Sequence, residues 1–132
     1  MIVVDTSVLI NLFRGIKTEA TAAFKSIEQD DVPFMLPAIC CQELLQGAKN
    51  QKEWMLLSNY LLTQEILYPK DEMTTYQGAA KIYFDLRRQG VTIRSTIDCL
   101  VAQQVLEYKH AKLLHDDVDF TNIAKKTPLI CF

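Results

Sequence analysis

Five acidic side chains in this sequence have residue types and positions that suit a shared divalent metal ion: Asp5, Glu43, Asp98, Asp117 and Asp119. Asp5 directly follows an apolar run at the start of the chain, and Asp117 and Asp119 follow a second apolar run near its end. Carboxylates held a few ångströms apart repel one another and raise each other's pKa. A divalent cation relieves that repulsion, and ligands that are all oxygen favour Mg²⁺ or Mn²⁺. The acids therefore predict a metal-dependent enzyme that acts on phosphate esters.

Two of these acids also suit a purely structural role at the start of a helix. Asp5 has the position of an N-cap for a short helix that begins at Thr6. Asp98 stands three residues after Ser95, which is the spacing of a capping box. However, Asp98 shares a helical face with Ala102 and Val105, and a carboxylate on an apolar face is costly to bury unless it is paired or bound to metal. We therefore expect Asp98 to be a ligand.

The other acids lie on a helix rim and in a loop. Glu43 falls at the rim of the apolar arc of its helix, a position that suits an acid reaching into a cleft. In the acidic loop, the fourth acid of the site is Asp116, Asp117 or Asp119. One aspartate of this loop is expected to cap the next helix, and Asp116 has the character of a solvated turn residue.

The segments that must position these acids alternate between strands and helices. Short apolar runs predict strands or extended segments at residues 2–4, 32–36, 66–68, 112–115 and 129–131. Helical periodicity and end signals predict helices at residues 6–15, 18–29, 37–48, 51–64, 72–89, 96–109 and 120–126. In the helix at 51–64, the inner side is expected to hold Trp54, Leu57, Leu61 and Leu62. This alternation predicts an α/β fold with a mainly parallel sheet, whose site lies beyond the carboxyl ends of the strands.

Length and composition describe one ordinary globular domain spanning residues 1–132. The chain is 49% hydrophobic and 23% charged, and no apolar run reaches the roughly 20 residues that span a bilayer. We expect a cytoplasmic protein without a membrane segment, and four reduced cysteines, since no metal-binding or CxxC spacing occurs. The net charge of −2 permits a nucleic-acid substrate without indicating one. Small basic groups such as Arg87, Arg88 and Arg94 are typical of solvated surface.

Four segments together resemble the PIN-domain ribonucleases, and in particular the VapC-type toxins. VVDTSVLI at 3–10 is similar to the opening hVhDTSvhh motif, and PAICCQELLQG at 37–47 to the helix that carries the second acid. TIDCLVA at 96–102 is similar to the third-acid motif, and LLHDDVDF at 113–120 to the segment LLHxDxDF. The resemblance covers essentially the whole chain. It implies a PIN-like three-layer sandwich, with a central sheet of about four to five strands flanked by helices.

The resemblance assigns a catalytic quartet of Asp5, Glu43, Asp98 and Asp117, with Asp119 as an auxiliary acid. Asp5, Asp98, Asp117 and Asp119 would bind Mg²⁺ or Mn²⁺, whether as one ion or two, and Thr6 would support Asp5 by a hydrogen bond. The implied activity is endoribonucleolytic hydrolysis of RNA, leaving 5′-phosphate and 3′-hydroxyl ends. The implied partners are a VapB-like antitoxin and a second copy of the chain, in a homodimer or a toxin–antitoxin hetero-oligomer.

One departure from the family pattern concerns the acidic loop, where Asp116 and Val118 stand at positions that are often basic in the family.

Alternative functions also remain open from sequence. A phosphatase of the haloacid-dehalogenase type begins with a similar aspartate but needs a second acid where this chain has Ser7. A receiver domain would need an acceptor aspartate after a middle strand and a later lysine, and neither is evident. A catalytically inactive PIN fold that only binds is the third alternative.

Overall fold

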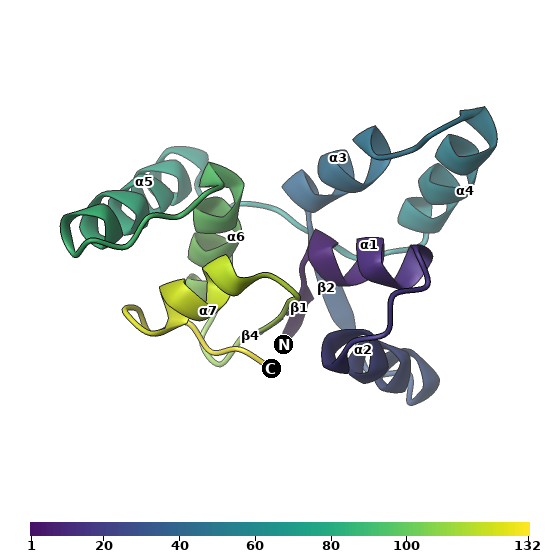
Figure 1. Cartoon of the computed structure of the whole chain (residues 1–132), viewed down its shortest axis with the longest axis horizontal. Helices are drawn as coiled ribbons and strands as arrows, with labels where there is room; N and C mark the ends of the chain where they lie inside the picture. The colour runs from purple at the N-terminus through teal and green to yellow at the C-terminus, as the bar shows by residue number, and fades with distance from the viewer.

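Four short parallel strands form the central sheet of the computed structural model, which describes all 132 residues (Figure 1). The strands are β1 (Ile2–Val4), β2 (Phe34–Pro37), β3 (Ile66–Leu67) and β4 (Lys112–Leu114), in the order β3-β2-β1-β4. β1 is paired with β2 on one side and with β4 on the other, and β2 is paired with β3. Because all four strands are parallel, their carboxyl ends lie along a single edge of the sheet.

Seven helices cover the two faces of this sheet. One group consists of α1 (Thr6–Phe13), α2 (Glu19–Gln29), α3 (Ala38–Gln46) and α4 (Gln51–Leu62). The other consists of α5 (Glu72–Arg88), α6 (Thr96–Leu106) and α7 (Val118–Ala124). In Figure 1 the first group lies to the right of the strands and the second to the left, and both termini lie near the centre. The predicted α/β sandwich of three layers is therefore confirmed.

Alternating side chains of the strands divide the interior into two hydrophobic cores. Val3 and Leu113 face the core that is built with α5, α6 and α7. Val4 and Leu114, one residue later in each strand, face the core that is built with α1, α2 and α4. Successive residues of a strand point to opposite faces. The continuous apolar runs in the sequence are thus explained by strands that are covered on both sides.

The helix ends follow the capping signals in the sequence. Thr18 and Thr21 form a reciprocal capping box at the start of α2, and the side chains of Asn50 and Asp71 cap α4 and α5. Gly90 follows α5 with φ of +77°, a left-handed conformation that glycine adopts without strain. These ends fix where each helix leaves the sheet and so where the connecting loops begin. No helix has the length and apolar character needed to cross a bilayer.

One prediction about the periphery of the fold is wrong, and a second is only partly right. Residues 129–131 do not form a strand and contribute only a single parallel bridge between Leu113 and Cys131. In α4 Leu57 is buried and Leu61 packs against the same core, as predicted, whereas Trp54 is 43% exposed and Leu62 is 83% exposed. α4 lies at the margin of its layer and packs mainly on α3, so one narrow stripe of it is covered. A helical apolar pattern identifies a helix but cannot show how many of its apolar residues find a neighbour.

A matched pair of leucine truncations tests this division between core and surface. Leu113 is 0% exposed and Leu62 is 83% exposed. Leu113→Ala should lower the free energy of unfolding by about 2–5 kcal/mol, because it removes buried methyl groups and leaves a cavity. Leu62→Ala should change it by less than about 0.5 kcal/mol. Urea unfolding measures both values, and a loss of similar size at Leu62 would contradict the placement of α4.

Candidate metal centre

The five predicted acids all lie at the carboxyl edge of the sheet, and they come from four separate segments of the chain. Asp5 follows β1 and caps α1, and Glu43 lies on α3 after β2. Asp98 lies in the first turn of α6, and Asp117 and Asp119 follow β4 at the start of α7. The ligand atoms of Asp98, Asp117 and Asp119 lie within 4.8 Å of one another, as do those of Asp5, Cys40 and Glu43. Parallel strands therefore bring together acids that are more than a hundred residues apart.

Asp98 is the acid of this cluster that has a buried oxygen without a hydrogen-bond partner. Its side chain is buried, with 7% exposure, and its Oδ2 atom has no hydrogen-bond partner. Burial, together with the charges of Asp5, Asp117, Asp119 and Glu43, raises the pKa of Asp98 to about 8. Ser95 makes no side-chain cap to α6, so the capping-box alternative for Asp98 is wrong. A buried carboxyl oxygen without a donor is expected to have a ligand that the chain itself does not supply.

Asp5 serves both as a helix cap and as a member of the acidic cluster. Its Oδ2 atom accepts hydrogen bonds from the Ser7 amide at 2.9 Å and from the Ser7 hydroxyl at 2.6 Å. The same Ser7 hydroxyl accepts a hydrogen bond from the Asp116 amide at 2.9 Å. Ser7 thus connects the end of β1 to the loop after β4. Ser7 was not predicted to belong to the site, although its position two residues after an N-cap aspartate is one whose amide such a cap accepts.

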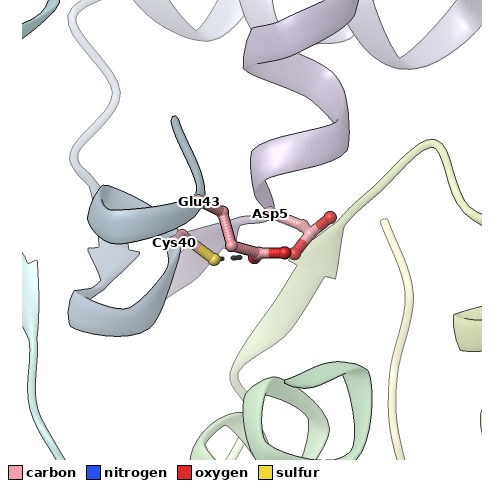
Figure 2. A group of neighbouring side chains, drawn as sticks. All are labelled: Asp5, Cys40 and Glu43. Atoms are coloured by element: carbon pink, nitrogen blue, oxygen red, sulfur yellow. Dashed lines mark hydrogen bonds between the residues drawn. The ribbon is translucent and has the colours of Figure 1, made fainter. Parts of the chain in front are cut away.

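Glu43 is held by Thr6, which corrects the role predicted for that threonine. The Thr6 hydroxyl donates to Glu43 Oε1 at 3.0 Å and to the Cys40 carbonyl at 3.4 Å, and it makes no hydrogen bond to Asp5. Figure 2 shows the Glu43 carboxylate lying beside that of Asp5. Burial raises the pKa of Glu43, with smaller contributions from Asp5 and Asp117. Glu43 is half-buried, as expected for an acid at the rim of a cleft.

Cys40 supplies a thiol, not a thiolate, to this part of the site. Its sulfur lies 3.6 Å from Asp5 Oδ1 and donates to it, as drawn in Figure 2. Burial and the neighbouring charge of Asp5 raise the pKa of the Cys40 thiol well above its ordinary value. A protonated thiol is a poor metal ligand. The effective donor set is therefore made of carboxylate oxygens.

Asp117 and Asp119 are positioned by α7 and by a cation from another loop. Asp117 caps α7 by accepting the Asp119 amide at 2.9 Å. Arg94, in the loop before α6, pairs with Asp117 Oδ1 at 3.2 Å and with Asp119 Oδ1 at 3.5 Å. The Arg94 amide also donates to Asp119 Oδ2 at 3.1 Å. Arg94 was expected to be ordinary solvated surface, and nothing in its local sequence indicates this pairing.

Asp116 is not the solvated turn residue that was expected. Its carboxylate accepts hydrogen bonds from Asn11 at 3.0 Å and from Thr18 at 2.7 Å. Asp116 therefore ties the acidic loop to α1 and to the start of α2. This pairing turns it away from the group formed by Asp98, Asp117 and Asp119. The geometry accordingly gives Asp116 a role in holding the loop, and it places both Asp117 and Asp119 beside Asp98.

His115 borders the cluster without adding a charge to it. Its Nδ1 atom accepts a hydrogen bond from the Asp117 amide at 3.2 Å, and its ring contacts Phe120. Burial lowers the pKa of His115 despite the nearby carboxylates. The neutral ring helps to shape the loop that presents Asp117.

These residues fit a hard divalent cation. The available donors are carboxylate oxygens, several of them are close together, and one buried oxygen is unpartnered. Oxygen-only sites of this kind suit Mg²⁺ or Mn²⁺, whereas a zinc site would be expected to use thiolate or imidazole nitrogen. The ligand atoms of Asp98, Asp117 and Asp119 form one close group, and Asp5 lies in the second group with Glu43.

Comparison with known proteins gives one family and several relatives. The family model described as "PIN domain" matches residues 2–126. The chain is 30% identical over 132 residues to VapC ribonuclease Mb1587 of Mycobacterium bovis and to ribonuclease VapC11 of Mycobacterium tuberculosis. Each alignment covers 98% of this chain and 96% of the relative.

Solved structures with a similar fold come from three bacteria. The matches are VapBC2 from Rickettsia felis bound to a promoter DNA fragment (TM-score 0.74, 19% identity), VapBC-1 from nontypeable Haemophilus influenzae (0.72, 22%) and FitAcB from Neisseria gonorrhoeae (0.67, 20%). All three alignments cover 100% of this chain, and they cover 98%, 97% and 96% of the respective matched chains. At these identities the matches establish a shared fold.

The raised pKa of Asp98 predicts an unusual dependence of stability on pH in metal-free protein. The unfolded chain loses this proton near pH 4, whereas the folded chain retains it until about pH 8. Over that interval the folded state binds more protons, so stability should fall as pH rises and level off above about pH 8. Thermal unfolding with chelator should show that Asp98→Asn loses this fall, which we expect to be about 5 °C or more.

A control variant separates this effect from the general loss of a charge. Asp30 is exposed and its carboxylate makes no hydrogen bond within the chain. Asp30→Asn should therefore retain the wild-type slope between about pH 5 and about pH 8. An unchanged slope in Asp98→Asn would mean that the Asp98 carboxyl is not protonated in the folded protein.

The Ser7 hydroxyl should contribute to both stability and metal affinity. Ser7→Ala removes the donor to Asp5 and the acceptor for the Asp116 amide, so the free energy of unfolding should fall by about 1–3 kcal/mol. Mn²⁺ should also bind more weakly, because Asp5 is less well positioned. Ser26→Ala, which removes an exposed hydroxyl, is the matched control. Calorimetric titration with Mn²⁺ together with urea unfolding measures both effects, and equal results for the two variants would contradict the assigned role.

Proposed function

The chain belongs to the PIN-domain family and is a homologue of VapC ribonucleases, and we propose that it is a metal-dependent endoribonuclease that acts as the toxin of a toxin–antitoxin pair. The observation that carries this proposal is the cluster of acids around the unpartnered Asp98 oxygen. Homology over the whole chain supports the ribonuclease activity, since the relatives bear that name. The proposed cofactor is Mg²⁺ or Mn²⁺.

The side chains of the site have distinct proposed roles in hydrolysis. Asp5, Asp98 and Asp117 would hold the cation, and Asp119 would add negative charge beside it. A bound divalent ion would lower the pKa of a water molecule and stabilise negative charge on the phosphate. Glu43, fixed at one oxygen by Thr6, would orient the attacking water. Water adds to phosphorus, the bond to the 3′-oxygen breaks, and that oxygen gains a proton, which leaves 5′-phosphate and 3′-hydroxyl ends.

We further propose a protein partner and a homodimer, and two apolar surfaces support these contacts. On α4 the large exposed side chains are Trp54, Met55, Leu56 and Leu62. Between α5 and α6 there is a hollow of about 400 Å³ lined mainly by apolar side chains, including Tyr76, Tyr83, Ile97 and Leu100. Exposed apolar areas of this kind commonly mark protein contacts. The structural neighbours described as VapBC and FitAcB support a small antitoxin as the partner.

Cleavage of RNA by the purified chain is the direct test of the activity. Wild-type protein freed of any antitoxin should cut a total-RNA pool in Mg²⁺ or Mn²⁺ and should stop cutting in EDTA. Asp98→Asn and Asp5→Asn should each lower the rate by at least about 100-fold, because each removes a proposed metal ligand. Sequencing the product ends identifies the target and checks for 5′-phosphate.

Matched variants and an alternative substrate make this experiment decisive. Asp30→Asn should cleave at the wild-type rate, which excludes a general effect of altered charge. Cleavage that persists in Asp98→Asn would indicate a contaminating nuclease or a wrongly assigned site. Metal binding without RNA cleavage, but with hydrolysis of p-nitrophenyl phosphate, would favour a phosphatase. Metal binding without either activity would favour an inactive binding module.

A further inference from the structure

Arg94 is the one cation of this chain that forms ion pairs with the acidic cluster, and the proposed function does not account for it. Its guanidinium pairs with Asp117 Oδ1 at 3.2 Å through Nη2 and with Asp119 Oδ1 at 3.5 Å through Nε. The only other ion pair of the chain joins Lys81 to Asp85 within α5. A positive group therefore already occupies carboxylate oxygens that a metal ion is expected to use.

The two ends of Arg94 have different environments. Its side chain is 69% exposed, while the Asp119 side chain that it contacts is 4% exposed. The Arg94 amide is fixed to Asp119 Oδ2 at 3.1 Å, so the backbone is tied to the site. Because the guanidinium is exposed and its backbone is anchored, it can turn away from these carboxylates once another cation compensates their charge.

A metal ion and the Arg94 guanidinium would compete for the same carboxylate oxygen. Asp117 Oδ1 already accepts the Asp119 amide at 2.9 Å in addition to Arg94. When a divalent cation draws on the charge of Asp117 and Asp119, it removes most of the attraction that holds the guanidinium there, and the two cations repel each other. The guanidinium is then free to turn outward from the same anchored backbone.

We propose that Arg94 is a phosphate-binding residue that the acids hold in place until metal binding releases it. This inference rests on the proposed nuclease function. The released guanidinium would lie next to the metal centre and would present a planar fork of donors, which suits a phosphodiester oxygen pair. Without metal, Arg94 neutralises Asp117 and Asp119 and weakens metal binding. With metal, it contacts the RNA backbone near the cleavage position and contributes to positioning the substrate.

Arg94→Gln separates these effects while leaving the acids in place. The backbone amide of residue 94 remains available to Asp119, and Asp117 remains the cap of α7, so the variant changes the counter-ion more than the geometry. Calorimetric titration should therefore show Mn²⁺ binding about three- to ten-fold more tightly to Arg94→Gln than to wild type. Arg87→Gln is the matched control, because Arg87 is exposed and has no ion pair, and its Mn²⁺ affinity should equal that of wild type.

RNA binding provides the second measurement, made in a Glu43→Gln background to slow cleavage. Fluorescence anisotropy with labelled single-stranded RNA should show weaker binding for Arg94→Gln in Mn²⁺. The dependence of log Kd on log salt should also decrease in slope by about 0.7, as expected for one lost phosphate contact. In EDTA the two proteins should have the same slope, because Arg94 is then paired with the acids.

The outcomes distinguish failure of this inference from failure of the proposed function. Unchanged or weaker Mn²⁺ binding by Arg94→Gln would overturn the competition between Arg94 and the metal. An unchanged salt slope in Mn²⁺, or a slope difference that persists in EDTA, would overturn the metal-dependent phosphate contact. If wild-type protein binds neither Mn²⁺ nor RNA, the proposed nuclease function itself fails.

Discussion

The burial of Asp98 among other acids is the constraint on which the rest of this site depends. A carboxylate that is nearly inaccessible, has an unpartnered oxygen and is surrounded by four other acids cannot remain charged near neutral pH without compensation. The chain limits the problem in two ways, by keeping a proton on Asp98 and by placing Arg94 against Asp117 and Asp119. With both arrangements in place, the acidic cluster can still bind further positive charge. A divalent cation would supply that positive charge, in keeping with the proposed metal-dependent activity.

The short parallel sheet explains how so small a protein maintains this arrangement. Each strand contributes only two to four residues, but β1 and β4 end side by side and deliver Asp5 and Asp117 to the same edge. Hydrogen bonds between loops then fix the details. Ser7 joins the end of β1 to the loop after β4, and Asp116 joins that loop to α1 and α2. The acids therefore depend on contacts between residues that do not themselves bind metal.

Much of this architecture could be predicted from sequence because it follows from local patterns. Apolar runs identified all four strands, three of them closely and β2 with displaced ends. The order of strands and helices then placed the acids at one edge. Features that depend on distant neighbours could not be predicted. The hydrogen bonds of Thr6 to Glu43, of Asp116 to Thr18 and of Arg94 to Asp117 each join segments far apart in the chain. The exposure of Trp54 and Leu62 could not be predicted for the same reason. It depends on whether another element packs against that side of α4, which the periodicity of the helix does not show.

The most direct test of a metal centre around Asp98 is anomalous diffraction from crystals of the protein grown or soaked with Mn²⁺. We predict a single strong anomalous peak within coordination distance of Asp98 Oδ2, with Asp5 and Asp117 as further ligands. A second, weaker peak nearer Glu43 would be compatible with two ions in the same site. The account would be contradicted by crystals that show no peak at this edge of the sheet, or by Mn²⁺ bound elsewhere while the Asp98 oxygen remains without a partner.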